Sequence, residues 1–599
     1  MKKSLLSILA AAIILASCGG NKENTDKVQR LAKGNVYYGG VFRMNEEEDF
    51  RNLYPLSVNE AVSFRIAMQV YEGLVKLSSK DLTVVPSLAE KWEVSDDAKT
   101  FTFHIRKGVK FHDNECFEGG TGREITAKDF KYSLDKACES SPNNQGFFVF
   151  QNRVTGANEY FESTKLKKPL AGGVSGIKVI DDYTLQISLN YPFAGFINVL
   201  TMPYGWVFPK EAVDKYGAEM RIKCVGTGPF LPKEVKEGEA VILTRNENYW
   251  AKDEHGNQLP YLDAIKVTFI KEKKAELLEF KKGNLEMVYR LPIEMIGDIT
   301  GEFEEAQKGG NPPFEMQNSQ QLSLQYYGFQ NLSKPFDNKL VRQAFNYAID
   351  REQIVNFVLQ GDGQAAKYGA VPSVLTGYKS ELIKGYVFDA DKARQLLAKA
   401  GYPNGKGFPE LTLDLNSGGG RNTQVAEAVQ KMLQENLNIK VNLNQMPLAQ
   451  LLDKYETGKS LFWRTAWQAD YPDPESFLNL FFGENVPATM AENSYVNCVR
   501  FKNAQYDTLF KQALHEVDLE KRYALYRKAD QLAVDEAAYM PIYYEEISRL
   551  MQPYVKNCDQ NSLEYRDLTR VYIIPKDKIK IELQKPDSTV TEEDIKSNK

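Results

Sequence analysis

The chain has 599 residues, too many for one hydrophobic core, so about two to four domains are expected. Hydrophobic residues make up 43% of it and charged residues 26%, an ordinary globular composition. The formal net charge of −5 is small beside 75 basic and 80 acidic residues. No basic excess of the kind that nucleic-acid binding needs is present, so we expect no nucleic-acid partner.

The N-terminus predicts an export signal that ends at a lipidation site. Residues 1–17 read as a signal peptide: MKK is a short positive region, and the apolar run after it is too short to span a bilayer comfortably. The LASC motif at 15–18 resembles a bacterial lipobox, which implies cleavage before Cys18 and acylation of its sulfur. A plain secretory signal with an incidental cysteine is the alternative. Residues 18–35 are small and polar, and we expect a lipidated, flexible tether.

The remaining cysteines allow at most two disulfide bonds and leave at least one thiol free. They are scattered along the chain at Cys116, Cys138, Cys224, Cys498 and Cys558. Because the sequence contains no CxxC pattern, it offers no zinc or thioredoxin-type site, and no metal or other cofactor is expected.

Hydrophobic periodicity predicts a strand and a helix in the first two thirds of the chain. Residues 101–105, FTFHI, alternate as a half-buried strand does. The segment 340–358 repeats apolar residues at helical spacing, and Asp337 and Asn338 are candidate N-caps for it.

A βαβ unit follows. Residues 411–415 and 438–444 read as strands, and residues 423–437 between them read as a helix, which predicts a parallel strand pair with a right-handed crossover. Three glycines at 418–420 lie where phosphate loops occur, but they match no phosphate-binding pattern, so a turn is expected. Residues 576–599 are charged and poor in aromatic residues, which predicts a disordered C-terminal tail.

Two acidic residues stand in the most apolar neighbourhood of the chain. The stretch 463–482, WRTAWQADYPDPESFLNLFF, contains Asp470 and Asp473 three residues apart. Asp473 lies between two prolines and reads as a turn former or helix N-cap for the segment after it. Asp470 has no such local explanation, although a purely structural cap is an alternative for it as well.

Several spaced motifs occur along the chain in this order: TVVPSLAEKWEVSDDAKTFTFHIRKGVKFHD, ITAKDFKYSL, GTGPF, RNENYW, PYLDAIK, VRQAFNYAIDRE and WRTAWQADYPDPESFLNLFF. Together and in this order they resemble the bacterial extracellular solute-binding proteins of the oligopeptide, dipeptide and nickel transporter type (family 5). The resemblance covers about residues 36–560, and a lipobox is in keeping with the family.

The resemblance implies an α/β, two-lobed periplasmic-binding-protein-like fold (type II, cluster C) with an extra small domain in lobe I. Ligand would bind in a cleft between the lobes, which close by a hinge motion. The expected division is as follows: lobe I from residues 36–80, 175–290 and 525–575; a small inserted domain from 81–174; and lobe II from 291–524.

In peptide-binding members, the residue matching Asp470 meets the peptide's ammonium group. A charged end buried in a closed cleft needs an opposite charge, and Asp470 would supply it. Arg464 matches an arginine that can meet the peptide's C-terminal carboxylate, which its planar fork suits. Trp467 would form a flat wall for a side chain, and its neighbours Ala466 and Gln468 complete the expected ligand-binding stretch.

The peptide backbone also needs partners, and strand addition to main-chain groups of the receptor would supply them without reading side chains. In the family, the segment just before the YEGL motif makes some of these contacts. Here that segment contains Asn59, Glu60 and Ala61, before Tyr71. The alignment over this segment leaves a shift of one residue open.

The expected function is therefore that of a membrane-tethered substrate-binding receptor of an ABC importer. It would be an exported monomer, anchored by Cys18 acyl chains in the periplasm or on the cell surface, that delivers short peptides to a permease with ATPase subunits. Alternatives are a saccharide or metal-chelate cargo, or a surface lipoprotein outside transport. Asp470 and Asp473 could in principle form a glycosidase pair, but both lie on one loop and no other catalytic motif occurs, so an enzyme is not expected.

Overall fold

A computed structural model describes residues 29–579 except residues 194, 309, 311, 418, 419 and 491. The predicted signal peptide, Cys18, the first part of the tether, two of the three glycines and residues 580–599 of the tail lie outside the described residues. Within the described residues, no helix combines the length and apolar character that a membrane span needs.

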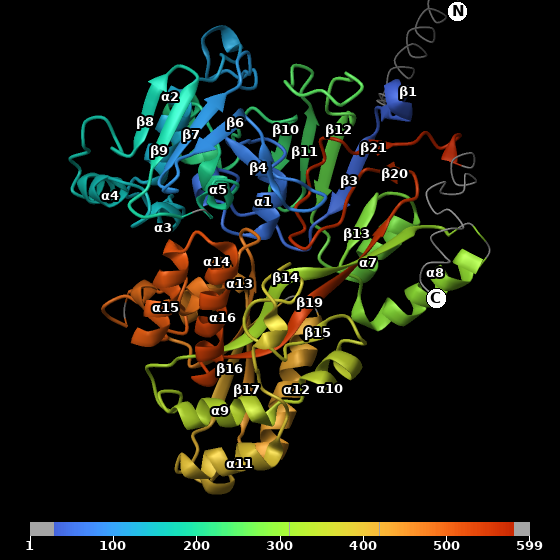
Figure 1. The fold of residues 1–599 in the computed structure, drawn as a ribbon. Helices are drawn as coiled ribbons and strands as arrows, with labels where there is room; N and C mark the ends of the chain where they lie inside the picture. Colours follow the sequence, from blue (N-terminus) through green and yellow to red (C-terminus); the bar gives the residue numbers. More distant parts are fainter. Residues whose placement is uncertain are drawn as a thin grey trace, which may run out of the picture.

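The chain forms two lobes that lie one above the other in Figure 1. Lobe I is built on a four-stranded sheet in the order β10-β11-β12-β3, in which β12 and β3 are parallel although more than 200 residues separate them. Its strands are β3 (Val41–Asn45), β10 (Phe230–Lys236), β11 (Ala240–Arg245) and β12 (Ala264–Thr268).

The small domain of lobe I is a second four-stranded sheet in the order β6-β7-β9-β8, covered by helices. Strand β7 (Thr100–Ile105) buries alternate residues, as its sequence pattern predicts. Strands β8 (Ile177–Asp181) and β9 (Thr184–Ser188) complete this sheet, although they lie beyond the expected end of the domain at residue 174. The other elements are β6 (Ala89–Val94), α2 (Ala127–Ala137), α3 (Phe147–Phe150) and α4 (Ala157–Lys165).

Lobe II contains the predicted βαβ unit. Strands β16 (Leu411–Asn416) and β17 (Val441–Met446) pair in parallel, and α12 (Gly420–Leu437) connects them. They belong to a seven-stranded sheet in the order β13-β19-β14-β18-β16-β17, with β15 also paired to β19. The sheet's other strands are β13 (Met287–Tyr289), β14 (Glu315–Phe329), β15 (Gln364–Ala365), β18 (Phe462–Gln468) and β19 (Tyr539–Met551).

The predicted helical segment after Asn338 is two helices rather than one. Asn338 caps α9 (Lys339–Ala348) by accepting a hydrogen bond from the backbone N–H of Leu340 at 3.0 Å. The chain then becomes extended at Ile349, and Asp350 caps α10 (Arg351–Gln353). The break lets the buried Arg351 guanidinium donate to the carbonyl of Pro541 at 2.6 Å, which periodicity could not reveal.

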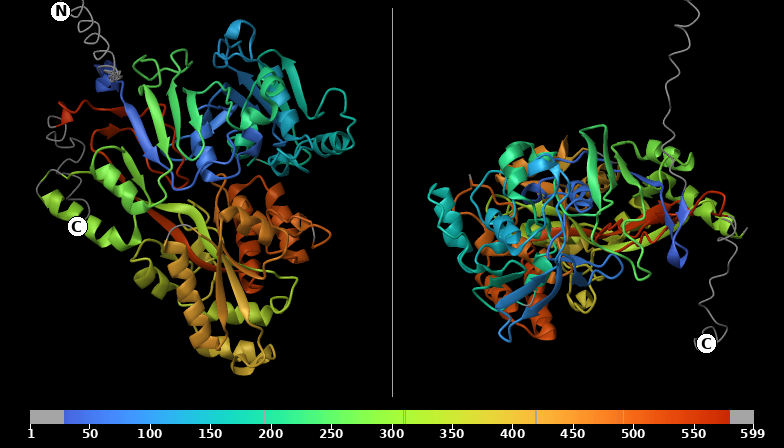
Figure 2. Two further views of the ribbon diagram at one scale, coloured as in Figure 1. Left: turned by 180° about the vertical axis from the view of Figure 1, so that it is seen from behind. Right: turned by 90° about the horizontal axis from the view of Figure 1, so that it is seen from above.

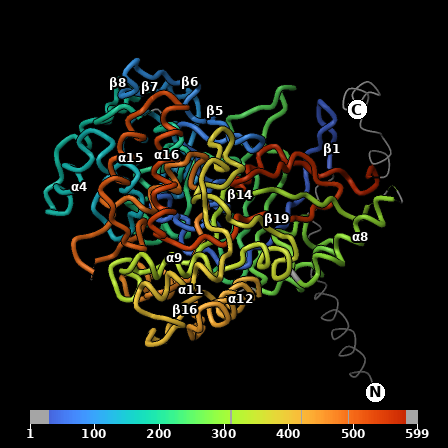
Figure 3. The backbone as a smooth tube through the Cα atoms, turned by 60° about the horizontal axis from the view of Figure 1, so that its bottom comes forward, coloured from blue at the N-terminus to red at the C-terminus, as the bar shows by residue number. Residues whose placement is uncertain are grey.

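Two long strands connect the lobes. Figure 3 shows β14 and β19 side by side through the middle of the molecule, where they pair antiparallel. Gln320 is paired with Glu546 and Leu324 with Tyr544, so residues 321–323 form a bulge in β14. A bulge locally bends and twists a strand pair, which suits the crossing from one lobe to the other.

Three of the sequence motifs meet in the core of lobe I. The buried carboxylate of Glu72, from YEGL, accepts hydrogen bonds from Thr227 of GTGPF at 2.9 Å. It also accepts from Tyr249 at 2.8 Å and Trp250 at 3.1 Å, both from RNENYW. These motifs therefore hold lobe I together.

The remaining elements complete the lobes and their edges. Residues 30–31 pair with 37–38, and Lys33 exchanges hydrogen bonds with Asn257, so the last part of the expected flexible tether is attached to lobe I. All five described cysteines are free thiols. The elements are β1 (Arg30–Leu31), β2 (Tyr37–Tyr38), α1 (Ala61–Ala67), β4 (Val75–Leu77), β5 (Val84–Pro86), α5 (Phe196–Val199), α6 (Lys210–Tyr216), α7 (Lys273–Lys281), α8 (Ile296–Lys308), α11 (Ala390–Lys399), α13 (Leu448–Glu456), α14 (Pro474–Leu478), α15 (Ala504–His515), α16 (Leu519–Asp535), β20 (Val555–Lys556) and β21 (Tyr572–Ile573).

Candidate functional site

Strand β18 has one paired edge and one largely open edge. It pairs with β14 along its whole length, but β16 reaches only Phe462 and Trp463 on the other side. The N–H of Ala469 donates to the carbonyl of Leu322 in β14, and the carbonyl of Leu461 accepts from the N–H of Gln330, directly after β14. Odd-numbered residues of β18 therefore point their main-chain groups toward β14. The main-chain groups of Ala466 and Gln468 therefore point to the open edge, where no strand of the described chain lies.

The loop after β18 holds three acids, two of which are fully paired. Asp473 caps α14, as predicted, by accepting from the N–H of Glu475 at 2.9 Å, and its other oxygen meets Arg522 of α16. Glu475 accepts from Arg153 at 2.6 Å and from the hydroxyl of Tyr471. Both carboxylates are buried and satisfied, which is the usual condition for an acid inside a protein.

Asp470 differs from these two neighbours. Its N–H donates to Ser476 at 3.0 Å, but no cation or donor of the described chain contacts its carboxylate. The side chain is exposed to solvent, although protein atoms surround it at longer range. The surrounding protein, together with the charge of Glu475, raises the pKa of Asp470 to about 7.

Aromatic side chains of both lobes share the electrostatic environment of Asp470. Burial raises the pKa values of Tyr204 in lobe I and Tyr495 in lobe II, and the charge of Asp470 adds to both shifts. Phe148 of α3 makes edge contacts with both tyrosines, each at 6.0 Å between ring centroids. Trp467 is half-buried, and its indole N–H has no partner among the described residues. The two lobes thus meet around an unpaired negative charge.

Arg464 lies on the opposite face of β18 from Trp467. It shares a face with Phe462, whereas Trp467 shares one with Trp463, because side chains alternate along a strand. Its guanidinium donates to Asn416 at 3.1 Å and to Gln325, and it contacts no carboxylate of the described chain. Asp470 and Arg464 therefore flank the open edge, each without an ionic partner, rather than forming one cluster.

The second predicted stretch lies at the start of α1, where Figure 1 shows lobe I facing lobe II. The backbone is extended at Glu60, but Ala61 is already helical, so an extended edge can involve only Asn59 and Glu60. Glu60 uses one carboxylate oxygen to accept from the N–H of Arg51 at 3.0 Å. Its charge also contributes to the raised pKa of Tyr204, as the charge of Asp470 does.

A C-terminal segment, residues 558–566, ties the end of β18 to the interlobe strands. The side chain of Gln468 donates to the carbonyl of Leu563 at 2.7 Å. Leu322, in the bulge of β14, donates its N–H to Ser562 at 2.7 Å. The segment thus fixes the open edge relative to the crossing of the lobes.

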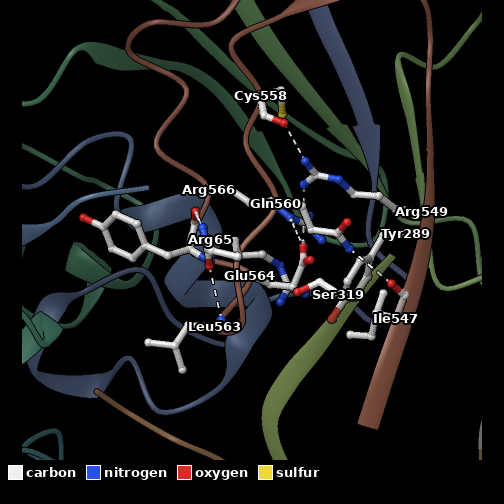
Figure 4. Close-up of polar contacts among 12 residues, drawn as sticks. Arg65, Tyr289, Ser319, Ile547, Arg549, Cys558, Gln560, Leu563, Glu564 and Arg566 are labelled. Carbon is white, nitrogen blue, oxygen red and sulfur yellow. Dashed lines mark hydrogen bonds and ion pairs between the residues drawn. The ribbon is translucent and has the colours of Figure 1, made fainter. Parts of the chain in front are cut away.

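The same segment enters a buried ionic network, shown in Figure 4. Arg566 bonds to Glu564 at 3.2 Å and to Glu46 at 2.9 Å, and Glu46 also pairs with Arg65 of α1. Arg549 of β19 lies 4.0 Å from Glu564. Because these charges are buried and mutually paired, they are costly to separate and attach the segment firmly to lobe I.

Sequence reasoning missed the residues that surround Asp470 from elsewhere in the chain. Tyr204, Phe148, Tyr495 and Arg153 carry no local motif, and only the fold brings them to the loop. No group of three or more His, Cys, Asp or Glu residues in the described chain could hold a metal ion. The buried His112 bonds to the carbonyl of Gly228 at 2.8 Å, and its pKa is lowered to about 4 by burial.

Comparison with known proteins places this geometry in a family. The model of the bacterial extracellular solute-binding proteins, family 5 (middle region), matches residues 83–488. Heme-binding protein A of Haemophilus influenzae is 28% identical over 94% of this chain and 97% of its own length. The periplasmic oligopeptide-binding protein OppA of Escherichia coli is 28% identical over 92% and 95%.

A solved structure extends the likeness to three dimensions. The periplasmic binding protein DppA of Helicobacter pylori, in complex with the peptide STSA, is 25% identical and superposes with a TM-score of 0.76. The match covers 90% of this chain and 98% of that one. The two-lobed α/β fold expected from the sequence is thereby confirmed.

Proposed function

Because this chain belongs to family 5 of the bacterial extracellular solute-binding proteins, we propose that it is the receptor of an ABC importer and binds short peptides between lobes I and II. The observation that carries the proposal is the unpaired carboxylate of Asp470 beside the open edge of β18. A free peptide offers a cationic amine and a line of main-chain donors and acceptors. These groups are the partners that the carboxylate of Asp470 and the open edge of β18 lack.

In the proposed complex the peptide adds a strand to β18. Its ammonium group meets Asp470, and its main chain bonds to Ala466 and Gln468. Arg464, at the other end of the open edge, meets the C-terminal carboxylate when the peptide is short enough to end there. Trp467 forms a wall for one side chain. Asn59 and Glu60 contribute from lobe I.

The anchoring and delivery steps complete the proposal. Acyl chains on Cys18 hold the monomeric receptor at the membrane, in the periplasm or on the cell surface, and stable attachment needs two such hydrophobic signals. The closed receptor passes its peptide to a permease with ATPase subunits. The receptor itself binds and releases, and no chemical step is assigned to it.

A haem cargo is the second candidate, since one of the relatives is named as a haem-binding protein. The residues around Asp470 speak for the peptide instead. Haem iron is usually held by histidine, cysteine, methionine or tyrosine, and a lone carboxylate beside an open strand edge serves an ammonium better. Because tyrosine is among these ligands, Tyr204 and Tyr495 are the residues at which a haem cargo would be tested.

Native mass spectrometry of the full-length protein, purified without denaturation, tests the proposal. We expect bound masses that resolve into short peptides. One discrete mass of a haem or a sugar would keep the receptor function and overturn the peptide assignment. A protein that carries no ligand and also fails to bind added STSA would contradict the proposed function for this tetrapeptide.

A further inference from the structure

The small domain and lobe II are joined by a buried ion pair directly behind the proposed ammonium site. Arg153 follows α3 of the small domain, and Glu475 lies in α14 of lobe II. Nη2 of Arg153 is 2.6 Å from Oε1 of Glu475, and the two side chains are only 8% and 1% exposed. Figures 1 and 2 show the small domain resting on α14, α15 and α16.

Aromatic contacts hold the two sides of this pair in register. The Arg153 guanidinium lies over the ring of Phe193, also in the small domain, with its carbon Cζ 5.2 Å from the ring centroid. Tyr191 of the small domain packs on His515 of α15 at 4.5 Å between ring centroids. The contact of Tyr191 with His515 crosses to lobe II, as the ion pair does, and both would be lost if the lobes moved apart.

Glu475 is linked to Asp470 as well as to Arg153. Its second oxygen accepts from the hydroxyl of Tyr471, the residue next to Asp470, and its charge contributes to the raised pKa of Asp470. Without Arg153, two carboxylates would stand near one another in a water-poor site. With Arg153 in place, one acid is neutralised from the opposite lobe and only Asp470 needs a cation.

We propose that Arg153 is a positioning residue of the ligand site, which pairs with Glu475 only when the lobes are closed and so couples closure to the charge at Asp470. In the closed complex two acids face two cations: Glu475 faces Arg153, and Asp470 faces the ligand's ammonium. In the open receptor both acids are unpaired and attract the ammonium. This inference rests on the proposed function.

The loop supplies its own control. Arg522 pairs with Asp473 two residues before Glu475 and is equally buried, with 6% and 3% of the side chains exposed. Both partners of that pair lie in lobe II, so it persists whether the lobes are open or closed. Loss of a buried charge partner is common to R522Q and R153Q, but the ion pair that R153Q removes joins the two lobes, whereas the one that R522Q removes lies within lobe II.

The test uses full-length wild type, R153Q, R522Q and the double variant R153Q/E475Q, with the tetrapeptide STSA as probe. Small-angle scattering without ligand reports lobe separation, and stopped-flow tryptophan fluorescence reports association and dissociation of STSA. We expect R153Q to have a larger radius of gyration and to release STSA about tenfold or more faster, with little change in association. The double variant recovers part of the loss because no buried charge is left unpaired.

R522Q should lose thermal stability yet keep the wild-type dissociation rate. The inference is overturned if R153Q matches wild type in both scattering and dissociation, or if R522Q releases STSA as fast as R153Q does. If wild type fails to bind STSA, the proposed function fails for this probe. The scattering of the ligand-free proteins then decides the inference alone.

Discussion

Two carboxyl groups in different regions share a pKa of about 7 but differ in their hydrogen-bond partners. Asp530, in α16, is buried, and burial raises its pKa, but it accepts hydrogen bonds from the N–H of Ala370 at 2.8 Å and from Tyr378 at 3.3 Å. Asp470 has the same raised pKa, yet no donor of the described chain reaches its oxygens. A perturbed pKa therefore does not mark a ligand site by itself, and the proposed site rests instead on the missing partner of Asp470.

The largest expected difference between Asp470 and Asp530 appears when each acid is neutralised in turn. Asp470→Asn should weaken binding of STSA by about 2–4 kcal/mol, because the ligand's ammonium loses its buried partner. Asp530→Asn should leave the affinity unchanged, since its partners are internal. Isothermal titration calorimetry measures both. Equal affinity of wild type for STSA and for N-acetylated STSA would contradict the role of Asp470.

The pH dependence of ligand binding is a second test of the role of Asp470. The ammonium needs the ionised form of Asp470, and below pH 7 binding must first expel a proton from it. The dissociation constant should therefore rise about tenfold, or about 1.4 kcal/mol, for each pH unit below 7 and level off above it. Titrations from pH 5 to pH 8 test this. Asp470→Asn should remove the dependence, and a flat wild-type profile would refute the assignment.

Asp530 should show its shifted pKa in stability rather than in binding. Its native pKa lies above the ordinary value of 3.8, so the native state holds a proton that the unfolded chain releases. The stabilisation is complete below about pH 4 and is lost as pH rises to about 7, at no more than about 1.4 kcal/mol per unit. Urea unfolding of wild type and Asp530→Asn compares the two slopes. Parallel slopes would show that the pKa of Asp530 is not raised in the native state.

The smallest expected effect concerns the open edge beside Asp470. Ala466→Pro removes one N–H that points to this edge while keeping a backbone conformation compatible with a strand. We expect STSA to bind about 1 kcal/mol more weakly, the net value of one hydrogen bond. Ala466→Ser retains the N–H and is the matched control. An unchanged affinity for the proline variant would mean that the peptide does not add a strand here.

The features predicted from the sequence are those that nearby residues determine. The βαβ unit, the alternation of β7 and the cap by Asp473 each depend on a few neighbouring residues, and the structure confirms them. The break of the helix at Ile349 could not be predicted, because it serves a contact between Arg351 and the distant Pro541. Periodicity alone continues the helix through it.

The candidate site was predicted in part for the same reason. The motif that contains Arg464, Trp467 and Asp470 is continuous in sequence, so the resemblance could locate it. The open edge depends on where β16 stops pairing, and the pair of Arg153 with Glu475 joins residues 322 positions apart. Such features depend on the assembled fold, and no local sequence pattern predicts them.

The open edge of β18 also has a consequence for how the protein behaves at high concentration. Unpaired strand edges are templates on which other chains can assemble into aggregates. Here the free stretch between Arg464 and Gln468 is short, because β16 covers the strand up to Trp463 and the chain turns away after Gln468. A segment of that length offers a second copy too few hydrogen bonds to nucleate a growing sheet. We therefore expect that an edge kept open for a ligand, as proposed, does not make the protein prone to aggregate.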